Sequence, residues 1–253
     1  MAQTLNDFLQ EPTDYSVYRL NAGERALAFV IGFVVAVIVM QVFFGNIIFD
    51  VICGIGTGIA FQPLLAGILK KRRKNKLLTQ FKDMLDSLNT SYSVGKNTMG
   101  AFQDAMNDMS LQYGANSYIG LELGRINIGL ANVSSIEDLL ADFAQRSGLE
   151  DVRTFADVFY SVNRRGGNIK SVISETKSII CEKIEIEQEI ETVTSASKNS
   201  LYVIMVMPLL IVPVTSGFME DTSPIVSILT KLGAIVLFVV AFLIGNKITD
   251  IKF

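Results

Sequence analysis

The junction "VICGIGTGIAFQPLLAGILKKRRKNK" (residues 51–76) decides the fold of this chain. Residues 51–69 carry no charge, whereas the next seven residues, 70–76, hold six basic side chains. A helix needs about 20 apolar residues to cross a hydrocarbon core, and basic residues collect on the cytoplasmic side of such helices. The junction therefore predicts a membrane helix that ends in the cytoplasm.

Three other apolar runs flank this junction. Residues 26–49 and 201–219 carry no charge, and residues 225–246 carry only Lys231. The mean hydropathy is +0.40, which is high for a soluble domain, and 253 residues are too few to bury four such helices in one core. We therefore expect an all-α membrane protein with four transmembrane helices in two hairpins. The expected spans are residues 23–44, 47–69, 201–219 and 225–247.

Charge also predicts the orientation. The short linkers 45–46 and 220–224 contain no Lys or Arg, so the positive-inside rule puts them outside the cytoplasm. Both termini (1–22 and 248–253) and the middle segment 70–199 are then cytoplasmic, and the protein is multi-pass in the cytoplasmic membrane. The basic run 70–76 is also expected to bind anionic membrane lipids.

The middle segment has the periodicity of a six-helix bundle. Apolar residues recur at spacings of three and four, and Gly95, Gly114 and Gly148 are placed to end helices. Ser134, followed by Glu137, predicts a capping box at the fourth helix. The sixth helix follows residue 168 without Gly or Pro until the third apolar run, which predicts a rod linking the bundle to the membrane.

Composition excludes several kinds of chemistry. The chain has no histidine, which removes His-dependent hydrolysis, HExxH zinc sites and haem ligation by His. Cys53 and Cys181 are expected in different compartments and cannot pair. Residues 77–199 hold 11 basic and 17 acidic side chains, which argues against nucleic acid as a ligand. We expect no enzyme, and no catalytic, cofactor or metal residues.

The stretch "RRGGN" (164–168) interrupts the helical pattern. Two glycines allow a sharp turn, and Asn168 is a suitable N-cap for the sixth helix. The first interpretation is a tight corner, and the second is an exposed basic tip that binds a partner. The candidate partner-binding residues are Arg164, Arg165, Gly166, Gly167 and Asn168, with Glu185 and Glu189 on the acidic face of the sixth helix.

Two features of the apolar runs carry further hypotheses. Gly54 and Gly58 lie one helical turn apart, a spacing that allows close helix packing, although glycine is common in membrane helices. Asp50 and Lys231 are expected at similar depth. They either form an intramembrane pair or extend separately to headgroups.

Four stretches in this order resemble a known family. They are "FKDMLDSLNTSYSVGKNTMGAFQDAM" (81–106), "LELGRINIGLANVSSIEDLLADFAQRSG" (121–148), "RRGGNIKSVI" (164–173) and "LYVIMVMPLLIVP" (201–213). Together they resemble the type II secretion F domain of tight-adherence (Flp) pilus platform proteins. The stretch "RINIG" (125–129) departs from the small-residue spacing expected there.

The resemblance implies a non-enzymatic inner-membrane platform of a pilus or secretion machine. Such a platform couples a cytoplasmic hexameric secretion ATPase to the extraction and polymerisation of pilin subunits. It is expected to pair with itself or with a sister platform protein. The alternative is a membrane subunit of a transporter or channel, which predicts ionisable residues along several spans.

Overall fold

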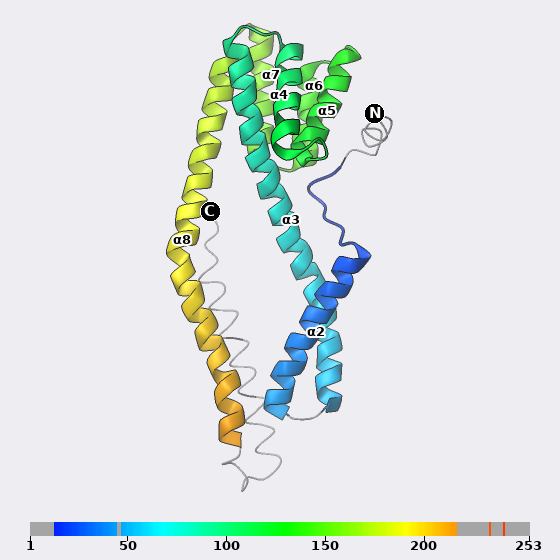
Figure 1. Cartoon of the computed structure of the whole chain (residues 1–253), viewed down its shortest axis with the longest axis vertical. Coiled ribbons are helices and arrows are strands. Elements are labelled where there is room, and N and C mark those ends of the chain that lie inside the picture. Colours follow the sequence, from blue (N-terminus) through cyan, green and yellow to red (C-terminus); the bar gives the residue numbers. More distant parts are fainter. Residues whose placement is uncertain (1–12, 45–46, 217–232, 234–239, 241–253) are drawn as a thin grey trace. The chain divides into compact units, whose positions relative to one another are not determined.

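A computed structural model describes residues 13–44 and 47–216, together with residues 233 and 240. The expected fourth span, apart from those two residues, and its Lys231 lie outside the described residues. The described part is all-α, as expected, with seven helices and no strand (Figure 1). The helices are α2 (Ala22–Phe44), α3 (Ile47–Ser93), α4 (Thr98–Tyr113), α5 (Tyr118–Ala131), α6 (Ile136–Ser147), α7 (Glu150–Arg165) and α8 (Ile169–Ser216).

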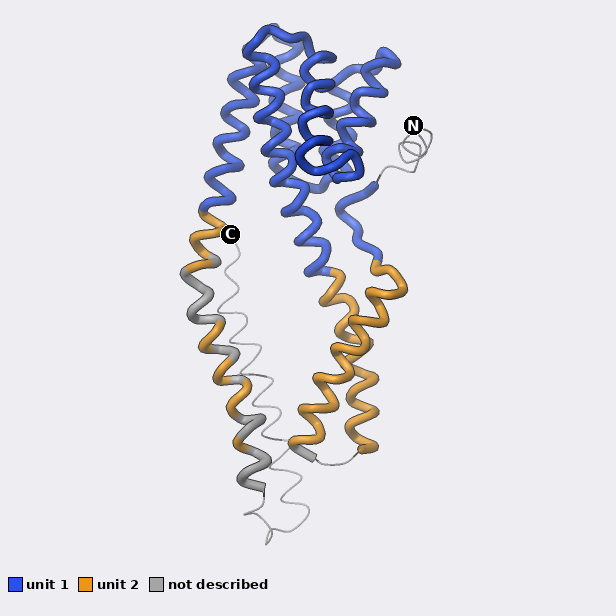
Figure 2. The backbone as a smooth tube through the Cα atoms, in the orientation of Figure 1, with its two compact units in different colours: residues 1–19, 67–185 blue, residues 20–66, 186–253 orange. Residues whose placement is uncertain are grey.

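The chain divides into two compact units (Figure 2). Unit 1 comprises Met1–Arg19 and Gly67–Glu185, and unit 2 comprises Leu20–Ala66 and Ile186–Phe253. The helices α3 and α8 each have residues in both units. The sequence indicated a separate N-terminal arm, but residues 13–19 belong to unit 1 with the helical bundle.

Unit 1 has a closed apolar core. Aromatic rings from three helices meet in it: Phe81 of α3 lies 6.1 Å from Phe143 of α6 and 5.6 Å from Phe155 of α7, measured between ring centroids. All three side chains are fully buried. Burial of each such ring contributes about 1.5–3 kcal/mol of transfer free energy. The regularly spaced apolar residues therefore stabilise the packing of these helices into a bundle.

The start of α6 differs from the sequence prediction. Ser135, and not Ser134, is the N-cap, because its hydroxyl accepts from the backbone N–H of Asp138 at 3.3 Å. The backbone N–H of Ser134 instead donates to the carbonyl of Gly129 at 2.9 Å and closes the end of α5. The predicted capping box of Ser134 and Glu137 is therefore wrong, because the preceding helix uses Ser134.

Unit 2 contains α2 and the first part of α3, residues 47–66. Many of their apolar side chains are exposed, including Val35 at 56% and Ile48 at 69%. By length and composition, α2 and α3 are the two helices among the residues searched that are able to cross a membrane. Their most apolar windows are mostly exposed, unlike the core helix of a soluble protein. This finding covers two of the four expected spans.

Candidate functional site

The most elaborate polar cluster of unit 1 surrounds Glu122 of α5. Its carboxylate is fully buried and accepts two hydrogen bonds from Arg146 of α6, Nη1 to Oε1 at 2.7 Å and Nη2 to Oε2 at 2.6 Å. Arg125 adds a third at 3.0 Å. Bidentate arginine–carboxylate pairs are among the strongest hydrogen bonds in proteins, so this cluster fixes α5 against α6.

Tyr15 joins this cluster from a segment without helical structure. Its hydroxyl donates to Oε1 of Glu122 at 3.0 Å, and its backbone N–H donates to the carbonyl of Arg146 at 2.9 Å. The ring lies edge-on to that of Tyr118, with 5.7 Å between centroids. Burial raises the pKa of Tyr15 above its ordinary value, and the negative charge of Glu122 raises it further. Residues 13–19 are thus held on the bundle by a buried tyrosine.

The basic run 70–76 also contributes to this cluster. The guanidinium of Arg73 lies 4.7 Å from the ring centroid of Tyr15 and 5.5 Å from that of Tyr118, a cation–π arrangement. The Nζ of Lys74 donates to the carbonyl of Gly148 at 2.6 Å. These two side chains bind within unit 1, so the expected lipid contact falls to the rest of the run, in which Lys71 and Arg72 are exposed.

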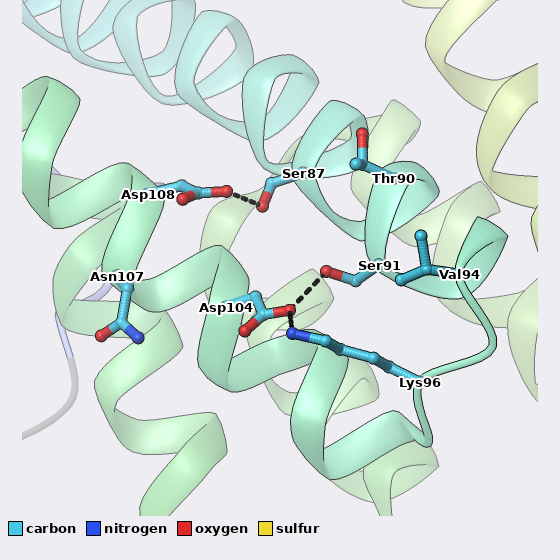
Figure 3. Close-up of a pocket in the computed structure, with 8 residues that line it drawn as sticks. All are labelled: Ser87, Thr90, Ser91, Val94, Lys96, Asp104, Asn107 and Asp108. Carbon is cyan, nitrogen blue, oxygen red and sulfur yellow. Dashed lines mark hydrogen bonds and ion pairs between the residues drawn. The ribbon is translucent and has the colours of Figure 1, made fainter.

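A polar pocket of about 300 Å³ lies between α3 and α4 (Figure 3). It is lined by Ser87, Thr90, Ser91, Val94, Lys96, Asp104, Asn107 and Asp108. Asp104 accepts hydrogen bonds from Lys96 and, at 2.8 Å, from Ser91, and Ser87 donates to Asp108. The hydrogen bond from Lys96 has the largest effect in lowering the pKa of Asp104, and the hydrogen bond from Ser91 has the next largest. Asp104 therefore stays ionised at neutral pH, and these contacts join α3 to α4.

Two findings concern metal ligands and cysteines in the described residues. Among the residues searched there, no group of three or more Cys, Asp or Glu side chains is arranged to hold a metal ion. Cys53 and Cys181 are both free thiols.

The stretch 164–168 forms the predicted corner. Gly166 takes the left-handed conformation with φ 71°, and the N–H of Gly167 donates to the carbonyl of Val162 at 2.9 Å. The side chain of Asn168 accepts from the N–H of Ser171 at 3.2 Å and caps α8. Arg164 and Arg165 are exposed in the last turn of α7. Their role in partner binding stays a prediction.

The other candidate partner residues lie on α8. Glu185 and Glu189 are both exposed, in line with an acidic outer face. Glu185 is the last residue of unit 1, whereas Glu189 belongs to unit 2. Their role in partner binding, like that of the corner, stays a prediction.

Gly54 and Gly58 of α3, the pair that the sequence singled out, pack against α2. A Cβ added to Gly54 would lie 2.7 Å from the ring of Phe33, and one added to Gly58 would lie 2.8 Å from the ring of Phe29. A Cβ on the intervening Gly56 would meet nothing within 4 Å. Residues 54 and 58 thus form the face of α3 on which α2 rests.

Asp50 is almost fully buried, with 2% of its surface exposed. Neither carboxylate oxygen has a hydrogen-bond partner in the part of the chain that the structure describes. The pair with Lys231 stays a prediction, since that residue lies outside this part.

Comparisons of the chain with family models, curated proteins and solved structures find no match.

Sequence analysis missed the Glu122 cluster altogether. The available signal was a single acid within an apolar helix, "YIGLELGRINIGLA" (118–131). Such an acid needs a buried partner. Arg125 is near in the sequence, but the bidentate partner Arg146 lies 24 residues away on another helix and Tyr15 lies 107 residues away, so neither was readable from the local pattern.

Proposed function

We propose that the chain is an inner-membrane platform of a pilus or secretion assembly machine. In this proposal the helical bundle is cytoplasmic and binds a hexameric secretion ATPase. The membrane helices guide pilin subunits from the bilayer, and the platform pairs with itself or with a sister platform protein. Four spans, with both termini in the cytoplasm, are part of the same proposal.

One observation carries this proposal. Both α3 and α8 have residues in the core of unit 1, and both continue as uninterrupted helices into unit 2. The part of α3 that belongs to unit 2 has exposed apolar side chains. A continuous helix transmits force better than a loop, because bending it breaks backbone hydrogen bonds. Uninterrupted helices therefore support a protein that couples a cytoplasmic motor to events in the bilayer.

The buried Asp50 favours a second candidate, a transporter subunit. An ionisable side chain buried in a membrane helix often marks an ion path. Substitution Asp50→Asn separates the two functions: a transporter loses ion flux, whereas a platform keeps ATPase binding.

The direct test uses the full chain in lipid nanodiscs and a purified hexameric secretion ATPase from the same organism. A platform is expected to bind the hexamer and to change its rate of ATP hydrolysis. Absence of binding, with both proteins folded, would contradict the platform function.

A further inference from the structure

The basic side chains of the bundle fall into two groups. Between residues 77 and 185 there are ten of them, and six form ion pairs with acidic neighbours. These six are Lys82, Lys96, Arg125, Arg146, Lys177 and Lys183. The other four have no ion pair with any described residue, and all are exposed: Arg153, Arg164, Arg165 and Lys170.

Three of these four unpaired side chains belong to residues beside one turn, the turn from α7 to α8. We call Arg164, Arg165 and Lys170 the basic corner. The guanidinium of Arg164 lies 5.0 Å from the ring centroid of Tyr160, itself 45% exposed. The corner is therefore positive and partly aromatic, on a bundle with an acidic balance.

Val133, in the turn from α5 to α6, is the second unusual feature. Its φ is 63°, and it is the one residue other than glycine with positive φ among those described. It ends α5 in a Schellman arrangement, with its N–H donating to Leu130 at 3.2 Å. Glycine is the usual residue at this position, since a β-branched side chain is strained there. Yet the side chain of Val133 is 94% exposed and gains almost no packing from the described residues.

Glu137 connects the two features. Its Oε1 accepts from Asn163 of α7 at 2.7 Å, and its Oε2 accepts from Ser135 at 2.8 Å. The hydrogen bond from Asn163 is the largest cause of a lowered pKa at Glu137, and the charge of Arg164 contributes to it. The turn with Val133 and the basic corner thus lie at one end of unit 1, where α3 ends (Figure 1).

We propose that Val133 and the basic corner form the surface on which the ATPase docks, through an acidic segment that carries an apolar side chain. This inference rests on the proposed function and names the contact site. Strained, exposed residues persist where a function requires them, and the apolar group of the partner covers Val133. An acidic segment is repelled by most of the bundle, which has 17 acidic and 11 basic residues over 77–199, and is attracted at this end.

The test compares two pairs of matched variants in the full chain, in nanodiscs, with the ATPase as the probe. Arg164→Glu together with Arg165→Glu is expected to weaken ATPase binding at least tenfold at low salt. Arg153→Glu is the control, because Arg153 is also an exposed arginine of α7 without an ion pair. It is expected to change the affinity less than twofold. At high salt, the double variant and the wild type should bind the ATPase with similar affinity.

Val133→Gly removes the apolar contact while it relieves the backbone, so a loss of binding cannot follow from a loss of folding. We expect binding about tenfold weaker, the lower end of the roughly 10–200-fold that one methylene is worth in an apolar pocket. Leu111→Gln is the control, because Leu111 is 88% exposed at the end of α4. A photo-crosslinking residue at position 133 should join the ATPase, and one at position 111 should not.

The outcomes separate the inference from the proposed function. If the wild-type chain binds the ATPase, and the Arg164→Glu/Arg165→Glu and Val133→Gly variants bind it equally well, this docking surface is wrong and the platform function stands. If crosslinking from position 133 yields a second copy of the chain, the surface binds that copy, and the ATPase is the wrong occupant. If the wild type does not bind the ATPase, the proposed function fails and the docking surface fails with it.

Discussion

Unit 1 and the helical hairpin of unit 2 use the same kinds of apolar residue in opposite ways. In unit 1 the large side chains are enclosed, as Phe81 and Phe155 show with no exposed surface. In the hairpin, Val35 and Ile48 expose more than half of theirs. Water drives the first arrangement, whereas the second is the kind of surface that suits an apolar solvent. The comparison teaches that the two units differ in burial as well as in charge: the same apolar side chains are enclosed in one and exposed in the other.

The two units also differ in the contacts that determine which helices pack together. Unit 1 uses a buried polar cluster in which the carboxylate of Glu122 is fully paired. The hairpin uses close contact, with Gly54 and Gly58 against two phenylalanine rings. Small residues serve this purpose where apolar burial gives no preference among helix pairings.

The largest expected effect on stability comes from a substitution that breaks the polar cluster around Glu122. Glu122→Ala leaves Arg146 and Arg125 without their buried partner, which should destabilise unit 1 by about 3–5 kcal/mol. The measurement is thermal unfolding of the full chain in detergent. Asp142→Ala is the control, because Asp142 also pairs with Arg146 but has 60% of its side chain exposed. Its expected cost is below about 1 kcal/mol. Equal costs would mean that the cluster does not hold the bundle.

The next effect concerns the hairpin alone. Gly58→Leu forces a side chain against Phe29 and should cost about 1–3 kcal/mol, whereas Gly56→Leu meets open space. Cys53 on α3 is partly exposed and reports opening of the hairpin through its alkylation rate in a Cys181→Ser background. We expect faster alkylation for Gly58→Leu than for Gly56→Leu, with unit 1 unfolding as before. If both variants react alike, this glycine face does not hold the hairpin together.

Local signals in the sequence predicted much of unit 1. Gly114, Gly148 and Gly166 mark helix ends as expected, because few other residues accept the required backbone geometry. Of the apolar residues at helical spacing, Phe81 and Leu85 are buried in the core, whereas Met99 and Ile179 are exposed. Each of these features depends on a few neighbouring residues, so it is visible without the fold.

Long-range features were not predictable in the same way. The sequence divides α3 at residue 69, where charge replaces apolar residues, but the helix continues because lysine and arginine are good helix formers. The place of Tyr15 depends on contacts with α3, α5 and α6 that no local pattern encodes. Val133 escaped notice since valine is not expected at positive φ.

A smaller effect tests how residues 13–19 are held. Tyr15→Phe keeps the ring but removes the hydrogen bond to Glu122, at a cost of about 1–2 kcal/mol. Burial, and after it the charge of Glu122, raises the pKa of Tyr15 above its ordinary value of 10.0, so the neutral tyrosine contributes its full stability below about pH 10. The contribution is lost as the pH rises further towards the folded pKa.

Denaturation at about pH 9 and pH 11 measures this loss. We expect the wild type to lose more stability between the two than Tyr15→Phe does. Tyr113 adds a loss of the same sign in both proteins, because its hydrogen bond to Asp83 raises its pKa to about 12. Identical alkaline losses in the wild type and the variant would show that Tyr15 is not buried against Glu122.

The smallest effect has the opposite sign. Val133→Gly should stabilise unit 1 by about 0.5–1 kcal/mol, because glycine accepts φ 63° without strain, which outweighs its greater freedom when unfolded. Val94→Gly is the matched control: Val94 is 71% exposed in the turn after α3, but its φ is negative, so glycine there should destabilise slightly. Thermal unfolding of the full chain measures both. A gain at position 133 with a loss at position 94 would show that the end of the bundle stores strain at one residue, as expected where stability is exchanged for a contact with a partner.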